Sequence, residues 1–217
     1  GEVRSKAVVL AAGAILTPAF LLRQNIALSS GKVGKNLAVH PTARIVALFP
    51  EVVDGWRGVP QGFYINDLAE EGIVLEGIHG PPALVAMSAP FLGSQFLDFI
   101  SQARYIGCFG LMVRDETRGR VTYSKLFQTP MIRYSLSSIE IARLQKGIGL
   151  AGRAFLAAGA ERLHFPVHGW TTLQGRADLE RFLQAKLKAT DFEIAAFHPL
   201  GTCRMGTDPK SSVVDPW

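Results

Sequence analysis

Apolar residues near the start of the chain form one short continuous run. Residues 6–12 (KAVVLAA) are β-branched and aliphatic, a pattern that predicts a strand buried on both faces in a parallel sheet. Gly13 ends this run. A helix follows, for which Thr17 can serve as the N-cap and Pro18 takes the favoured first position, and it continues to about Gln24. A strand, a glycine turn and a helix N-terminus form a backbone arrangement that can approach a cofactor closely.

From residue 42 the chain changes to short apolar stretches separated by glycine, proline and acidic residues. These stretches predict strands over residues 43–49, 62–66, 73–78, 105–113, 131–135 and 160–168. Residues 120–123 follow a turn and are predicted to pair back on 105–113 as a hairpin. Apolar residues at helical spacing predict helices over residues 89–104, 138–158 and 178–189. Antiparallel strands with interspersed helices indicate an α+β domain.

The long predicted helix, which Ser137 or Ser138 caps, contains a literal G-x-G-x-x-G at residues 147–152. A dinucleotide fingerprint needs a strand before it and an acidic residue about 20 positions after it. Here a helical pattern precedes the glycines, and Thr172 stands at that distance. We therefore interpret the glycines as small faces for close helix packing. The alternative, a nicotinamide-dependent dehydrogenase built on these glycines, is disfavoured.

Two histidines, His164 and His168, are four residues apart, a spacing that can bind zinc on a helix. Pro166 between them argues against a helix, since proline disrupts a helix interior. The sequence therefore predicts no metal site here.

The composition fits an ordinary globular protein of one or two domains. The chain has 217 residues, of which 48% are hydrophobic and 19% are charged, and no apolar run approaches the roughly 20 residues of a membrane span. The net charge is +5, but no basic run is interleaved with aromatic residues, which argues against nucleic-acid binding. Two cysteines far apart are compatible with a reducing compartment, so the cytoplasm is favoured while the compartment stays open.

Residues 198–206 (HPLGTCRMG) combine features that a plain structural loop does not need together. His198 can gain or lose a proton near neutral pH, and Pro199 fixes the next backbone angle. Gly201 and Gly206 allow close backbone approach or a positive φ. Between the glycines lie a hydroxyl, a thiol and a guanidinium. The plain alternative is a histidine that satisfies a loop, which is the usual role of an isolated His-Pro pair.

Three segments resemble the signatures of the glucose-methanol-choline (GMC) family of flavoprotein oxidoreductases. The order His-Pro-x-Gly-Thr-x-Arg-Met-Gly at residues 198–206 resembles the C-terminal signature of the family. Residues 13–22, with Gly-Ala-x-x-Thr-Pro-x-x-Leu-Leu, resemble the second signature, although residues 25–27 depart from the Ser-Gly pattern that usually follows. Residues 33–41 resemble Val-Gly-x-Asn-Leu-x-Asp-His-Pro, with Val39 in place of the acid.

The resemblance implies a fold and a domain plan. It implies an α+β fold with an antiparallel substrate-domain sheet and helices, plus parts of an α/β FAD-binding domain. Residues 1–41 would belong to the FAD-binding domain, 42–190 to the substrate-binding domain, and 191–217 would return to the FAD domain. Five apolar positions could line a substrate pocket or belong to an ordinary core, and core is favoured: Met87, Phe91, Phe96, Phe109 and Met112. His40 is interpreted as a structural histidine where the domains meet.

The resemblance also implies a reaction, in which a CH–OH group is oxidised with hydride transfer to FAD and His198 acts as the base. It implies contacts to the cofactor from Gly13, Ala14, Thr17, Pro18, Pro199, Gly201 and Thr202. The substrate would be a small-molecule alcohol of a long-chain or sterol-like type, with a sugar or sugar acid as the rival. The electron acceptor stays open among oxygen, a quinone and a cytochrome.

The chain is expected to be a C-terminal portion of a longer enzyme. It starts with glycine and a strand pattern, and it ends where another strand pattern begins. The resemblance places the ADP-binding segment before Gly1 and a second catalytic His or Asn beyond Trp217. We therefore expect the segment alone to bind FAD poorly and to be inactive, and to work with the remainder of the FAD domain. A non-catalytic binding or interaction module that retains the fold is the alternative function.

Overall fold

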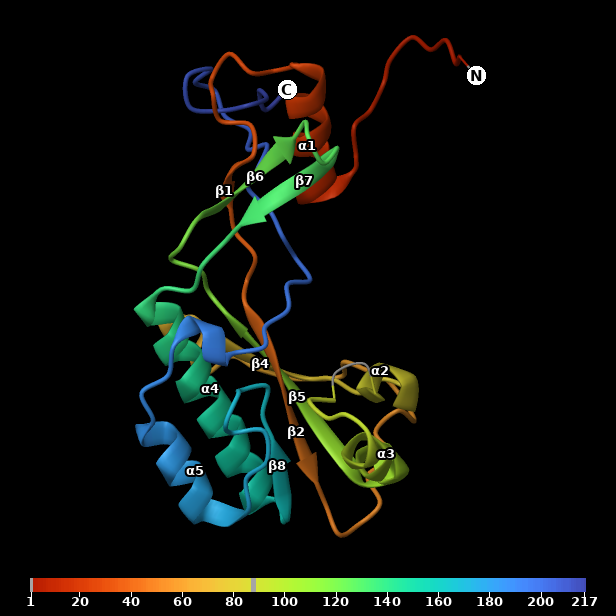
Figure 1. Cartoon of the computed structure of the whole chain (residues 1–217), viewed down its shortest axis with the longest axis vertical. Helices are drawn as coiled ribbons and strands as arrows, with labels where there is room; N and C mark the ends of the chain where they lie inside the picture. Colours follow the sequence, from red (N-terminus) through yellow and green to blue (C-terminus); the bar gives the residue numbers. More distant parts are fainter. Residues whose placement is uncertain (1, 87–88) are drawn as a thin grey trace. The chain divides into compact units, whose positions relative to one another are not determined.

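The computed structural model describes residues 2–86 and 89–217, so Met87 lies outside the described residues (Figure 1). The chain forms two compact units. Unit 1 contains Gly1–Val39, Thr117–Ser135 and Phe197–Trp217, and unit 2 contains His40–Glu116 and Leu136–Ala196. The segment Thr117–Ser135, which the sequence places among the substrate-domain residues, thus packs in unit 1. The roles of residues 1–41, 42–190 and 191–217 as flavin and substrate domains stay predictions.

Unit 2 is built on a five-stranded antiparallel sheet in the order β3-β4-β5-β2-β8. Its strands are β2 (Thr42–Leu48), β3 (Tyr64–Ile65), β4 (Ile73–Gly77), β5 (Ile106–Val113) and β8 (Arg162–His164). The central pair, β2 and β5, is in register from Thr42 opposite Met112 to Leu48 opposite Ile106. Four of these strands lie inside ranges that the apolar pattern predicts, and β2 begins one residue before its predicted range.

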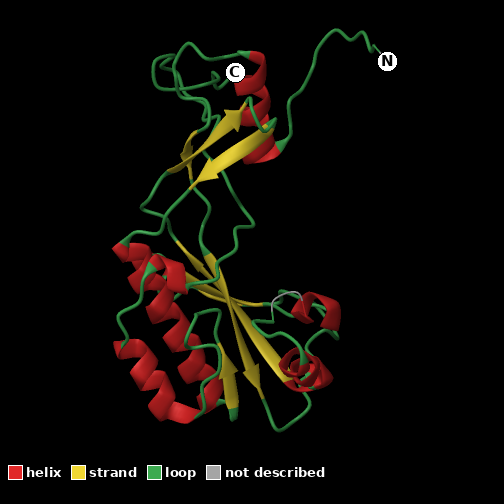
Figure 2. Cartoon of the chain, viewed as in Figure 1, coloured by secondary structure: helices red, strands yellow, loops and turns green. Residues whose placement is uncertain are grey.

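Helices cover both faces of this sheet (Figures 1 and 2). One face carries α4 (Ser138–Ala157) and α5 (Gly175–Gln184), and the other carries α2 (Pro82–Ala86) and α3 (Ser94–Ser101). Short 3-10 turns are η1 (Ala69–Glu71), η2 (Ala103–Tyr105) and η3 (Ala189–Asp191). Mixed helices and antiparallel sheets confirm the predicted α+β class. Among the described residues, no helix has the length and apolar character needed to cross a membrane.

The alternation of side chains along β2 explains why both faces are covered. Ala43, Ile45 and Ala47 face the core under α4 and α5, whereas Val46 and Leu48 face the core under α2 and α3. Successive side chains of a strand point to opposite faces, so a strand that is apolar at every position must be buried on both sides. Residues 45–48 of β2 are apolar at every position, so this part of the strand requires a helical layer on each face, whereas Thr42 and Arg44 near its start are half-buried.

The helix α4 confirms the predicted cap and the packing role of its glycines. Ser137 is the N-cap residue and forms a capping box with Glu140. The glycines at 147, 149 and 152 lie inside the helix, where the absence of Cβ lets neighbouring side chains approach. A Cβ at Gly147 would lie 2.5 Å from Leu111 Cδ1, and one at Gly152 would lie 3.0 Å from Leu179 Cδ1. The motif is therefore a packing surface.

Unit 1 combines one helix with a small antiparallel sheet. The helix α1 (Gly13–Gln24) packs against β6 (Gly119–Ser124) and β7 (Thr129–Arg133), and β1 (Lys35–Leu37) pairs with the other edge of β6 (Figure 1). The core of this unit consists of Ala19, Leu37, Val39 and Val121.

Four sequence predictions need correction. Residues 6–12 are not a strand, because the described residues offer that segment no pairing partner, and Val8 is 79% exposed. Residues 120–123 pair with β1 and β7, not with 105–113, because the chain has already crossed into unit 1. The first helix begins at Gly13, so Thr17 is not its N-cap and Pro18 lies inside it. The helix predicted over residues 89–104 is shorter, because Gly93 at φ 62 is its N-cap.

We expect Gly147→Ala to lower the free energy of unfolding by about 1 kcal/mol or more, because the added methyl meets the fully buried Leu111. Alanine favours a helix by about 1 kcal/mol over glycine, so the clash must exceed that gain. Gly149→Ala is the matched control. Its methyl meets the end of the half-buried Leu183 side chain, which can move, so stability should be unchanged or higher. Equal effects of the two substitutions in urea unfolding would contradict this account.

Candidate functional site

The segment that carries His198 is fixed to β1 by the backbone of unit 1. Ala38 and Leu200 exchange two backbone hydrogen bonds of 3.0 and 2.9 Å, and the Gly34 N–H donates to the Thr202 carbonyl at 2.8 Å. Gly201 has φ 91, and a Cβ there would collide with the carbonyl oxygen of Asn36. Glycine is therefore required at position 201 for two reasons: its positive φ and its contact with a neighbouring strand.

A buried side-chain hydrogen bond joins the same segment to α1. Proline has no N–H, so Pro18 cannot donate to the carbonyl four residues earlier, that of Ala14. The Thr202 hydroxyl donates to this carbonyl at 2.6 Å, and Thr202 is only 1% exposed. The threonine therefore replaces the donor that the proline removes. Two motifs that lie far apart in the sequence meet at this bond.

The imidazole of His198 is left exposed by this arrangement. Its side chain has no hydrogen-bond or ion-pair partner among the described residues of the chain. The neighbouring Phe197 and Leu200 are 65% and 49% exposed, although both are apolar. The backbone on one side of the histidine is fixed, and its ring is exposed.

The N-terminus of α1 offers backbone donors to a bound group. No side chain of the described residues caps this terminus, and the first turn contains no acidic residue. Gly13 has φ 73, and among the described residues no atom beyond its chain neighbours and its own helix backbone lies within 4 Å of the position that a Cβ would take. The N–H groups of a first helical turn have no partner within the helix and carry partial positive charge. The Thr17 hydroxyl accepts a hydrogen bond from the Ala12 N–H at 3.1 Å, which shapes the entry to the helix.

The chain after the histidine is held by its own hydrogen bonds. Arg204 Nε donates to the Ser211 carbonyl at 2.9 Å, so this guanidinium stabilises the loop. Burial raises the pKa of the Cys203 thiol, which keeps it protonated and unreactive near neutral pH. Backbone and side-chain hydrogen bonds from Lys210 and Ser211 lower the pKa of Asp208.

Most of the predicted site residues therefore come together in unit 1, and several of them act on one another. Ala14 and Thr202 form a hydrogen bond, Pro18 creates the need for that bond, and Gly201 contacts Asn36. The sequence reasoning missed Asn36 as a neighbour of the site. Its φ of 64 is a conformation that asparagine tolerates better than most residues, and that preference was the only local signal.

His164 and His168 do not share one face of a helix. His164 is the last residue of β8, and His168 lies in the loop after it, so the pair is not helical. The part of the chain that the structure describes contains no group of three or more His, Cys, Asp or Glu that could hold a metal ion. Burial, with a smaller contribution from the charge of Arg162, lowers the pKa of His164 to about 4.

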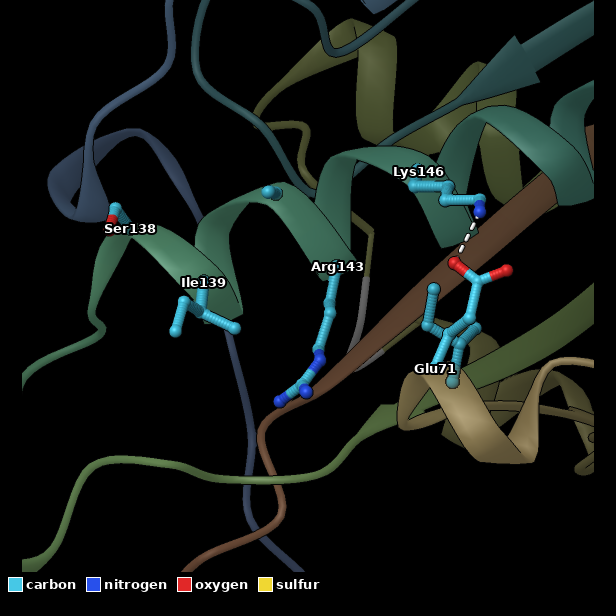
Figure 3. Close-up of a pocket in the computed structure, with 7 residues that line it drawn as sticks. Glu71, Ser138, Ile139, Arg143 and Lys146 are labelled. Carbon is cyan, nitrogen blue, oxygen red and sulfur yellow. Dashed lines mark hydrogen bonds and ion pairs between the residues drawn. The ribbon is translucent and has the colours of Figure 1, made fainter.

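A hollow beside α4 presents charges that are already paired (Figure 3). Lys146 forms an ion pair with Glu71, the one dashed line in that view. Arg143 pairs with Glu116 at 2.9 Å and also donates to the Arg114 carbonyl at 2.8 Å. Since these cations have partners, we do not assign a ligand to this hollow.

Comparison with known proteins identifies the class. Residues 115–217 match the family model described as GMC oxidoreductase. An uncharacterized GMC-type oxidoreductase of Mycobacterium tuberculosis is 33% identical over 215 residues, which cover 99% of this chain and 34% of the relative. A long-chain-alcohol oxidase of Arabidopsis thaliana is 28% identical over 240 residues, which cover 99% of this chain and 32% of the relative.

A solved structure supports the fold. The crystal structure of pyridoxine 4-oxidase from Mesorbium loti matches with a TM-score of 0.59 and 22% identity, over 94% of this chain and 42% of that one. The C-terminal part of the chain matches the GMC oxidoreductase model, and nearly the whole chain is similar to GMC-type oxidoreductases, as its motifs predict. It spans about a third of the length of the curated relatives named above.

We expect Thr202→Val to lower the free energy of unfolding of unit 1 by about 1–3 kcal/mol, because the carbonyl of the half-buried Ala14 then faces the buried position 202 without a donor. Thr202→Ser is the control, since it keeps the hydroxyl. In a Pro18→Ala background the cost of Thr202→Val should shrink, because the new N–H at position 18 can donate to Ala14. A double-mutant cycle in urea measures this coupling, and equal costs in both backgrounds would refute the replacement of the donor.

The low pKa of His164 makes unit 2 less stable in acid. Its pKa falls from 6.5 to about 4 on folding, so between these values the unfolded chain binds the proton and the folded chain does not. Stability is therefore retained above pH 6.5 and lost as the pH falls toward 4, by about 3 kcal/mol in total. His164→Gln should remove this share of the pH dependence of urea unfolding. His168→Gln, at a 62% exposed side chain, should keep it; the same slope in both variants would contradict the assignment.

Proposed function

We propose that the protein is part of an FAD-dependent oxidoreductase that oxidises an alcohol to a carbonyl, with His198 as the base. Similarity to the GMC oxidoreductases supports the reaction class. Members of this family generally use FAD, which supports the cofactor. The observation that carries the proposal is the geometry of the HPLGTCRMG segment. Its backbone is held at Leu200 and Thr202, while the His198 ring is exposed and has no partner among the described residues.

The residues of unit 1 fit a flavin. The open space at Gly13 and the uncapped first turn of α1 suit a group with carbonyl oxygens or negative charge. The residues that would hold FAD here are Gly13, Ala14, Thr17, Pro18, Pro199, Gly201 and Thr202. Because the Thr202 hydroxyl is already bonded to Ala14, we assign Thr202 to the wall of the site and leave contacts with the flavin to backbone N–H groups.

Oxidation of an alcohol removes a hydroxyl proton and a carbon-bound hydride from the substrate. FAD, when bound, supplies the acceptor of the hydride. The hydroxyl of the substrate donates a hydrogen bond to the imidazole of His198, which takes the proton as the carbonyl forms. The exposed side chains of Phe197 and Leu200 give apolar surface next to that ring, which suits the carbon chain of an alcohol.

A long-chain or sterol-like alcohol is the substrate class that we propose. The similarity to a long-chain-alcohol oxidase supports it, together with the apolar neighbours of His198. The remainder of the FAD domain is the expected partner of this chain within one enzyme. A cytoplasmic location stays a prediction.

The test replaces His198 by asparagine in the complete, flavin-loaded protein. We expect turnover of a long-chain alcohol to fall by about 10²–10⁴-fold, because a positioned base contributes that much. Flavin content, measured by absorbance after release, should be unchanged. His168→Asn is the matched control, an exposed loop histidine in unit 2, and should keep full activity.

Unchanged alcohol-driven bleaching of the flavin in the His198→Asn protein would overturn the assignment of the base. If neither the parent protein nor the variant bleaches with any alcohol although flavin is bound, the non-catalytic module becomes the better account. A preference for sugars over long-chain alcohols would overturn the substrate class alone.

A further inference from the structure

A cavity of about 330 Å³ lies in unit 2 between α3 and β8. Positions 95, 98, 99 and 102 share one face of α3 and the turn after it, since residues three and four apart are neighbours on a helix. Arg162 and His164 share one face of β8, because they are two residues apart on a strand. The volume falls in the range of small-molecule sites.

Three aromatic rings form one wall of this cavity. The His164 ring lies edge-on to Phe91 and to Phe99, with centroids 5.1 and 5.5 Å apart. Its Nδ1 lies 3.2 Å from the Thr172 hydroxyl, so this nitrogen already has a partner. His164 is 7% exposed and has a pKa of about 4, so the ring is neutral near pH 7. The wall therefore offers uncharged aromatic surface, on which another ring can pack edge-to-face or offset.

Two opposite charges line the same cavity without pairing. The guanidinium of the half-buried Arg162 has no hydrogen bond or ion pair to any described residue. The carboxylate of Asp98 likewise meets no cation within the described parts of the chain, and the two do not pair with each other. Other surface charges of this unit do find partners, as Arg153 with Glu180 and Arg104 with Asp54. Arginine binds carboxylates in a bidentate manner, so the carboxylate of a ligand can pair with the Arg162 guanidinium.

We propose that this cavity binds the zwitterion of an α-amino acid with an aromatic side chain. The carboxylate of the ligand pairs with Arg162, its ammonium group pairs with Asp98, and its ring packs against Phe91 and Phe99. Gln95 and Gln102 lie on the same side as Asp98 and close the polar rim. All the lining residues belong to unit 2, and the proposal requires neither FAD nor His198.

Isothermal titration of the protein with L-phenylalanine near pH 7 and at low salt tests the proposal. We expect saturable binding with one site per chain. Arg162→Gln and Asp98→Asn should each weaken binding by about tenfold or more, since each removes one charge-assisted contact. Arg133→Gln and Asp67→Asn are the matched controls, because they remove the same charges at exposed positions outside the cavity, and should leave binding unchanged.

Two analogues test the two charges without any change to the protein. Phenethylamine lacks the carboxylate and 3-phenylpropionate lacks the ammonium group, so each should bind at least about tenfold more weakly than L-phenylalanine. The comparison of these analogues uses the unchanged protein, so it tests the proposal even if a variant does not fold. No saturable binding of L-phenylalanine, equal binding of either analogue, or full binding by a folded Arg162→Gln protein would each overturn the proposal. Loss of alcohol oxidation in the His198→Asn protein would not bear on it.

Discussion

The hydrogen bond from Thr202 to the Ala14 carbonyl is the constraint on which the candidate site depends. It exists because Pro18 removes the helical donor for that carbonyl, and a buried carbonyl without a donor is costly. A proline inside a helix is normally a defect, but here it makes one carbonyl available to a segment 188 residues away. The bond fixes position 202, and the Leu200 backbone pairs with Ala38. The segment that carries the exposed His198 is thereby held at Leu200 and Thr202, without any hydrogen bond or ion pair from the described residues to the histidine side chain.

In unit 2, two buried carboxylates accept hydrogen bonds from backbone N–H groups at the points where the chain enters and leaves the unit. Asp115 accepts hydrogen bonds from the His40 N–H at 3.0 and 3.2 Å, at the first residue of the unit. Glu140 is fully buried and accepts from the N–H groups of Glu116 and Ser137, at 2.8 and 2.5 Å. Backbone donors at such points lack a strand or helix partner, so a charged acceptor satisfies them more strongly than a neutral one. These contacts fix the ends of the segments that make up the unit.

Local patterns predicted the elements well and the pairing of distant segments less well. The capping box and apolar spacing of α4 lie within a few residues, so Ser137 and the helix end were readable from the sequence. The partner of β6 depends on residues 35–37, more than eighty positions earlier, and no local pattern contains that information. The run at residues 6–12 shows the same limit, since an apolar segment becomes a strand only when another strand donates to it. The motif around His198 was readable, whereas its contact with Asn36 required the fold.

His198 and His164 are the same residue type in opposite environments, and the difference decides what each can do. Burial among Phe91 and Phe99 makes the charged form of His164 costly and lowers its pKa to about 4, so the ring stays neutral in the physiological range and is only a weak base there. It contributes an uncharged surface instead. His198 follows an apolar segment, but the backbone bonds at Leu200 and Thr202 turn its ring to the exterior. A base must reach a substrate proton, so we propose that role for the exposed His198, whereas His164 forms part of a cavity wall.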